Sequence, residues 1–222
     1  EQYTIANPGF GWSLPVSEGG RFPDGRWPTP KAKRDYSGLN IALEKRFSDN
    51  WQGGVNYTWS RVVGNYGGLS SAEEGGRNAP NAGRSFDLWF MGYDLQGKET
   101  NGLLPQDITH SVKIYGSYTL PFGLTIGLTA FGRSGLPLTT RLEANNAYLY
   151  PYNSADLGRL PWTAWADLFL EYTFRLGRTS TSLNLQVNNF TNTKTWQEKD
   201  TVPNRVTMPL SDHEILSGSF DY

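Results

Sequence analysis

The chain contains no cysteine, so neither a disulfide framework nor a thiolate metal site is available to it. It also lacks any run of about 18 apolar residues, which excludes a transmembrane helix. Its 20 basic and 21 acidic residues nearly cancel, and no clustered basic face points to a nucleic-acid partner. No signal peptide opens the chain at Glu1, so an exported protein is expected here in mature form or as an internal piece.

Catalytic signatures are missing as well. The two histidines, His110 and His213, fall at the start of an expected strand and in a late loop. There is no paired-histidine metalloprotease motif, no Gly-x-Ser-x-Gly elbow and no phosphate-binding P-loop. We therefore expect no enzyme activity and no cofactor.

Carboxylates in the expected loops could in principle bind Ca²⁺ through their oxygen atoms. They show no fixed ligand spacing, so we interpret them as solvated loop acids and expect no metal site. These residues are Glu73, Glu74, Asp87, Asp94, Asp156 and Asp212.

Aromatic residues, by contrast, are abundant. Trp, Tyr and Phe make up 14% of the chain although its overall hydropathy is low. Transmembrane barrels place Trp and Tyr in girdles at the two membrane interfaces, because an amphipathic ring suits the headgroup region. The composition therefore favours a membrane barrel over a soluble globule.

Three pairs of alternating segments, each joined by a turn of about three residues, predict three β-hairpins. Side chains two apart share one face of a strand, and in these segments one face is apolar and the other polar. The polar face carries charges in mid-strand, which suits a wet lumen: Glu44, Lys113, Asp167, Glu171 and Arg175. The expected hairpins span 36–63, 109–133 and 163–190, and the expected long outer loops span 64–108, 134–162 and 191–222.

A soluble antiparallel sandwich would alternate too, but its strands are typically about 5–6 residues long. The segments here have about ten residues or more, and short turns at one end oppose long loops at the other. This asymmetry is typical of a bacterial outer-membrane barrel, with the short turns in the periplasm. The sequence therefore predicts an all-β fold built as an antiparallel transmembrane β-barrel section.

Strand number limits this prediction. Six strands are clear, and the segments 3–6 and 202–208 are weak extras. Single-chain barrels of this kind begin at about eight strands, and an open sheet in lipid leaves unpaired edges. Either the chain is part of a larger barrel or several chains complete one; we favour the first.

One predicted hairpin reads Leu43-Glu44-Lys45-Arg46-Phe47-Ser48 and then Tyr57-Thr58-Trp59-Ser60. This hairpin resembles one of the TonB-dependent outer-membrane receptors, in their Oar-like branch, whose members carry a carboxypeptidase-regulatory-like domain. Further matching segments follow in order at 86–88, 104–105, 110–118, 134–139, 167–168, 172–174, 183–192 and 210–222.

The resemblance implies six to eight long strands from the C-terminal part of a barrel of about 22 strands. It implies partners as well: outer-membrane lipid, the rest of the same barrel and its plug domain, and an extracellular solute. The TonB complex would act through N-terminal parts, and neither a plug domain nor a TonB-contacting motif is visible in residues 1–222.

By resemblance, the function is transport of a scarce solute across the bacterial outer membrane. The alternative is a non-transporting surface or adhesion module whose loops bind a protein or glycan. Aromatic residues in the long loops are the candidate ligand contacts, although they could equally pack the loops onto the rim. They are Trp89, Phe90, Tyr93, Tyr148, Tyr150 and Tyr152.

Overall fold

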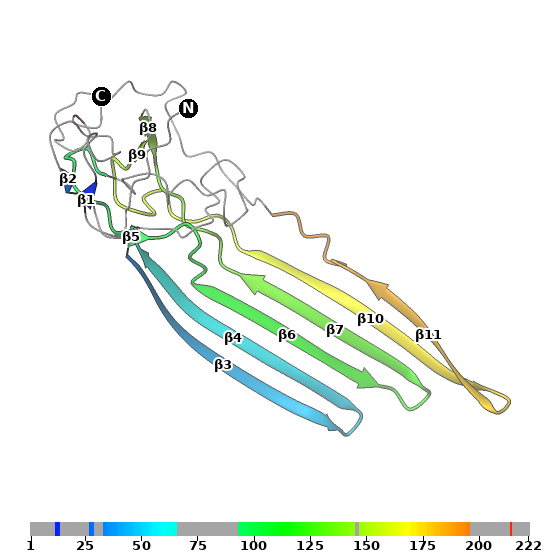
Figure 1. Ribbon diagram of the computed structural model, residues 1–222. Coiled ribbons are helices and arrows are strands. Elements are labelled where there is room, and N and C mark those ends of the chain that lie inside the picture. The colour runs from blue at the N-terminus through cyan, green and yellow to red at the C-terminus, as the bar shows by residue number, and fades with distance from the viewer. Residues whose placement is uncertain are drawn as a thin grey trace.

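The computed structural model describes residues 12–13, 27–28, 33–65, 93–144, 147–195 and 214. Six long strands form one antiparallel sheet, and a short strand, β5 (Gly102–Leu103), pairs with it at one end (Figure 1). The six are β3 (Arg34–Ser48), β4 (Trp51–Gly64), β6 (His110–Thr119), β7 (Leu124–Arg133), β10 (Thr163–Leu176) and β11 (Thr179–Val187). Two small sheets pair β1 (Trp12–Ser13) with β2 (Trp27–Pro28) and β8 (Leu142–Ala144) with β9 (Ala147–Leu149).

The long strands lie in the spatial order β11-β10-β7-β6-β4-β3. Neighbours in the sheet are therefore also successive long strands in the chain, which makes the sheet an up-and-down meander. Figure 1 shows the three tight turns at one end of the sheet and the described parts of the connecting loops at the other. The predicted all-β, antiparallel fold class is confirmed.

Residue choice explains the turns. Asp49 and Asn50 both have positive φ, +52° and +65°, as a type I′ hairpin turn requires. Gly177 (φ +62°) and Gly123 (φ +91°) supply the same freedom in the other two turns. Beside the first turn, Lys45 Nζ donates to the Ser48 carbonyl at 2.9 Å, where the β3–β4 register shifts.

Strand ends differ from the expected ones by a few residues. The third hairpin ends at Val187 rather than at residue 190, because Asn189 adopts a positive φ of +48°. Its backbone N–H instead donates to the Asp167 carboxylate at 2.6 Å. The weak strands expected at 3–6 and 202–208 lie outside the described residues.

The sheet is open within the described residues. Its two outer strands, β3 and β11, each pair on one side only. No second sheet covers either face there, and the few buried apolar side chains lie mainly at the loop end, for example Tyr93, Leu104 and Leu149. Large apolar side chains such as Leu43 (69% exposed) and Leu183 (70% exposed) therefore have no protein core to enter.

The described part of the chain contains no helix with the length and hydrophobicity needed to cross a membrane.

Candidate functional site

One face of the sheet is apolar across all six long strands. The cross-strand register aligns Leu43 with Val55 and Val55 with Ile114, and it aligns Leu128 with Leu168 further along. Each strand thus contributes alternate residues to a continuous surface, as a period of two requires. Many of these side chains are more than one-third exposed, so the face is built to meet an apolar environment outside the sheet.

Aromatic side chains border this apolar face at both ends. Trp51 and Tyr118 are directly paired near the turns, and Trp59 and His110 are paired near the loops. Eight residues separate the two rows, about 27 Å along a strand at about 3.4 Å per residue. A strand tilt of about 40° reduces that to about 21 Å, close to the apolar band of about 25 Å in outer-membrane barrels.

His110 completes the aromatic row at the loop end. Its ring stacks between Tyr57 and Trp162, with centroid distances of 6.1 Å and 6.0 Å. The Tyr57 hydroxyl and His110 Nδ1 are 2.8 Å apart, within hydrogen-bond distance. The His110 ring therefore joins strands β4 and β6 to Trp162, the residue that directly precedes β10.

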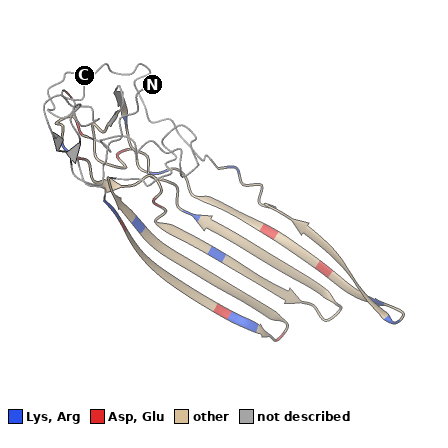
Figure 2. Ribbon diagram, viewed as in Figure 1, with Lys and Arg blue, Asp and Glu red and all other residues tan. Residues whose placement is uncertain are grey.

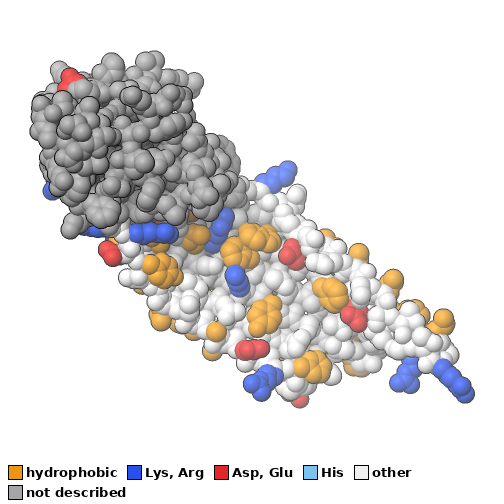
Figure 3. Space-filling model, viewed as in Figure 1, with side chains coloured by type: hydrophobic (Ala, Val, Ile, Leu, Met, Phe, Trp, Pro, Cys, Tyr) orange, Lys and Arg blue, Asp and Glu red, His pale blue; other side chains and the backbone are white. Residues whose placement is uncertain are grey.

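The opposite face of the sheet is polar and carries separated charges. Figure 2 shows acidic residues on β10 and a basic residue on β6, and Figure 3 shows charged side chains scattered between separate hydrophobic groups on the sheet. The acids on β10 are Asp167 and Glu171, and the base on β6 is Lys113. Lys113 Nζ lies 5.9 Å from the Phe131 ring centroid, and Phe131 packs against Trp165 at 4.5 Å.

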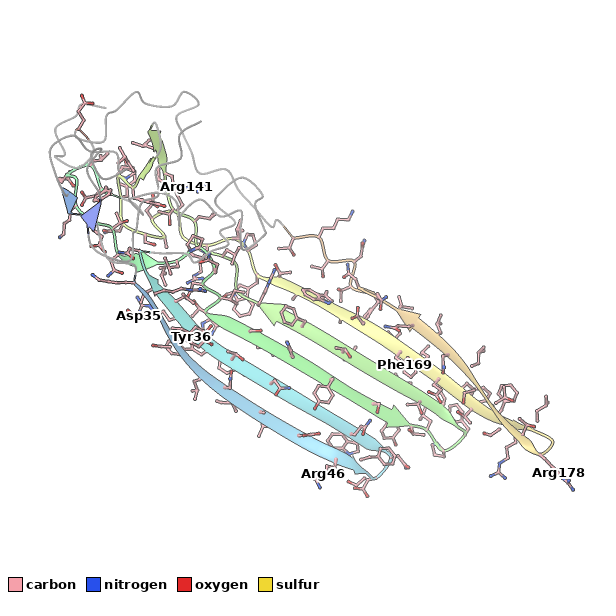
Figure 4. The ribbon with its side chains drawn as sticks, in the orientation of Figure 1. Asp35, Tyr36, Arg46, Arg141, Phe169 and Arg178 are labelled. Carbon is pink, nitrogen blue, oxygen red and sulfur yellow. The ribbon has the colours of Figure 1, made fainter. Side chains whose placement is uncertain are left out.

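A hollow of about 350 Å³ lies in this polar face. Gly127 and Thr129 on β7 form its floor, with Tyr115 on β6 at one side and Asp167 and Phe169 on β10 at the other. Figure 4 shows Phe169 near the middle of β10, away from the loops. Pattern reading missed these aromatic residues, since it assigned aromatic side chains to the membrane girdles.

The two long loops between the hairpins are joined at the rim by a buried ion pair. Arg159, from the loop after β7, donates to the carboxylate of Asp107, whose side chain is fully buried. The same carboxylate accepts from the Val62 backbone N–H at 2.6 Å and from the Thr109 hydroxyl at 2.9 Å. Arg159 also donates to the carbonyls of Asp107 (3.2 Å) and Gly135 (3.1 Å), so one side chain holds both loops and a strand end.

Further contacts join the same two loops. Tyr93 is buried and bridges to Leu149, and the Tyr150 backbone N–H donates to the Tyr93 carbonyl at 2.8 Å. Burial raises the pKa of the Tyr93 phenol well above its usual range, and the nearby Glu99 carboxylate adds to the rise. The Ser154 hydroxyl donates to the Leu103 carbonyl.

The candidate ligand contacts therefore have different surroundings. Tyr93 packs inside the joined loops, and Tyr150 is half-buried beside it. Tyr152 is 63% exposed. The side chain of Tyr148, on β9, and all of Trp89 and Phe90 lie outside the described residues. Ligand contact by the loop aromatics stays a prediction.

Two of the loop acids have structural partners. The Asp94 carboxylate accepts from the backbone N–H groups of Gln96 (2.9 Å) and Lys98 (2.8 Å). Asp156 accepts from the Thr140 N–H at 2.8 Å and from its hydroxyl at 2.6 Å. No group of His, Asp and Glu side chains suited to a metal ion occurs in the described part of the chain.

Comparisons with known proteins agree with this geometry. Residues 21–133 match the family described as outer membrane beta barrel domain. Over 200 residues the chain is 31% identical to the TonB-dependent transporter Oar of Myxococcus xanthus. That alignment covers 86% of this chain but 17% of the relative, so the chain spans about a sixth of the length of the protein it matches. No solved structure matches the chain.

Proposed function

Because the chain belongs to the outer membrane β-barrel domain family and lies in the bacterial outer membrane, we propose that it forms wall and outer loops of a TonB-dependent transporter. The apolar face contacts lipid and the polar face lines the lumen. The joined loops form the extracellular mouth, where a scarce solute is first bound. Energy comes from the TonB complex, acting on a plug domain supplied by the rest of the protein.

The observation that carries this proposal is the open, two-faced sheet. Each unpaired backbone group in lipid costs several kcal/mol, so the free edges of β3 and β11 require further strands. Strands of the same protein would supply them in a barrel of about 22 strands, the size of plugged outer-membrane transporters. The similarity to the Myxococcus xanthus transporter supports the same interpretation.

Transport is tested by deleting the gene for the whole protein and following solute depletion of the growth medium by mass spectrometry. We expect at least one solute to remain in the medium of the deletion strain, and in that of wild-type cells treated with a protonophore. Unchanged depletion, together with loss of a surface contact, would contradict transport and favour the adhesion alternative.

The partial-barrel proposal has its own test, which needs no ligand. Residues 1–222, refolded alone in detergent, are expected to aggregate or associate, because within the described residues the outer edges of β3 and β11 have no pairing strand. A compact, heat-modifiable monomer in this experiment would show that six strands can close and would overturn the larger barrel.

A further inference from the structure

The hollow in the polar face has the dimensions of a small-ligand site. Its volume of about 350 Å³ falls within the range of about 300–1,000 Å³ typical of such sites. Tyr115 on β6 and Asp167 on β10 are both paired with Thr129 on the strand between them. The two sides therefore stand two strand spacings apart, about 9.6 Å.

Two glycines on neighbouring strands leave room for the rings of Phe169 and Tyr115. A Cβ at Gly127 would lie 3.3 Å from the Phe169 side chain, and a Cβ at Gly54 would lie 2.6 Å from the Tyr115 ring. Each ring therefore lies over a glycine of the neighbouring strand rather than standing upright on the sheet. This arrangement leaves ring surface available from the lumen, and Tyr115 is 42% exposed.

Among the described residues, the carboxylate of Asp167 at the hollow has no ion-pair partner. Asp167 Oδ1 accepts the Asn189 backbone N–H at 2.6 Å, which fixes the carboxylate. Within the described residues, Oδ2 accepts no hydrogen bond and no base pairs with Asp167. The nearest lysine along the polar face, Lys113, lies instead over the Phe131 ring.

A fixed carboxylate beside aromatic rings matches the chemistry of a guanidinium group. Guanidinium is planar, stacks on aromatic faces and donates to a carboxylate in a fixed geometry, whereas an ammonium acts as a point charge. The side-chain amides of Gln52 and Gln186, also at the hollow, offer carbonyl oxygens for its remaining N–H groups.

We propose that this hollow binds the guanidinium group of an arginine-bearing peptide solute as it passes through the barrel. The inference rests on the proposed function and names the class of its substrate. Gln52 is the second residue of β4 and lies seven residues from Trp59, about 24 Å along the strand, whereas Asp167 and Phe169 are the fifth and seventh residues of β10. The site is therefore a second point of selection, on the sheet between the tight turns and the outer loops.

The test uses the whole protein in lipid bilayers, with Gln52→Cys as its single cysteine and a membrane-impermeant maleimide as the label. L-Argininamide is the probe, and L-lysinamide and the neutral L-citrullinamide are the comparators. We expect argininamide to protect Gln52→Cys at lower concentration than lysinamide does, and citrullinamide not to protect it.

Further substitutions then test whether argininamide protects Gln52→Cys by binding in the hollow. Asp167→Asn should raise the argininamide concentration for half-protection about tenfold or more, since a hydrogen bond to a charged group is lost. Phe169→Leu keeps apolar volume without a ring face and should raise it about threefold. Glu171→Gln, the matched control on the same face of β10, should leave it unchanged.

The outcomes separate failure of this inference from failure of the proposed function. If Gln52→Cys reacts and argininamide protects it no better than citrullinamide, the guanidinium site is overturned while the lumen assignment stands. If Gln52→Cys reacts only after Asp167→Asn, a segment of the protein itself fills the hollow, which also overturns a solute site. If Leu43→Cys reacts and Gln52→Cys does not, the face assignment and the transporter proposal both fail.

Discussion

The guanidinium of Arg159 reaches the buried carboxylate of Asp107 across 52 positions of sequence. Asp107 ends the first long loop and Arg159 ends the second, so this pair ties the bases of both loops to the start of β6 and to Val62 of β4. The bases of both loops are therefore held in fixed positions at the rim of the sheet.

Replacing Arg159 should loosen the contacts that hold the bases of the two loops together. Arg159→Ala leaves the Asp107 carboxylate buried without its base, which is expected to destabilise the joined loops by about 3 kcal/mol. The measurement is the rate at which external protease cleaves residues 93–108 and 134–160 in intact outer membranes. Arg178→Ala, in an exposed turn, is the control, and equal cleavage of both variants would contradict the structural role of the pair.

Gly135 should tolerate no side chain. A Cβ there would lie 1.9 Å from the Leu160 carbonyl oxygen, so Gly135→Ala must displace backbone that pairs residues 136–138 with 158–160. Gly132→Ala is the matched control, because its nearest neighbour would be 3.8 Å away. We expect Gly135→Ala to increase protease cleavage of the second loop and Gly132→Ala to leave it unchanged; similar behaviour of the two would refute the close approach.

Adjacent residues on opposite faces should respond differently to the same charge. Leu128→Arg places a cation on the lipid face and should destabilise folding by about 2–4 kcal/mol, whereas Thr129→Arg on the polar face should cost little. Denaturant titration of the whole protein in bilayers measures both free energies. Equal losses, or the larger loss for Thr129→Arg, would show that the faces have been assigned the wrong way round.

Substitutions at Asn50, in the first hairpin turn, should change stability according to how well the new residue tolerates a positive φ. Asn50 has a φ of +65°, where a β-branched side chain is strained, so Asn50→Val should destabilise the protein by about 1–2 kcal/mol. Asn50→Gly should be neutral or stabilising, since Gly is favoured at this position of a type I′ turn. Arg178→Val, at a turn residue without positive φ, serves as the control in the same denaturant titrations.

Local patterns were enough to predict the hairpins. Alternation with a period of two and the turn residues Asp49, Asn50 and Gly177 act over a few residues, so the sequence shows them directly. The Asp107–Arg159 pair could not be predicted in this way, because it depends on how two loops meet. Aromatic residues of the polar face were missed for another reason: Tyr115 and Phe169 are placed by glycines on neighbouring strands, and only the register reveals those neighbours.

The strand pairing that continues from β3 to β11 also governs how such chains can vary in length. A single residue added within a strand moves every following side chain of that strand to the other face, so charges enter lipid and leucines enter water. Two added residues restore the faces and shift only the height of the strand. Related chains should therefore vary freely in the length of their outer loops, whereas their strands should gain or lose residues in pairs. An even number of inserted residues leaves every side chain of the strand on its original face of the sheet.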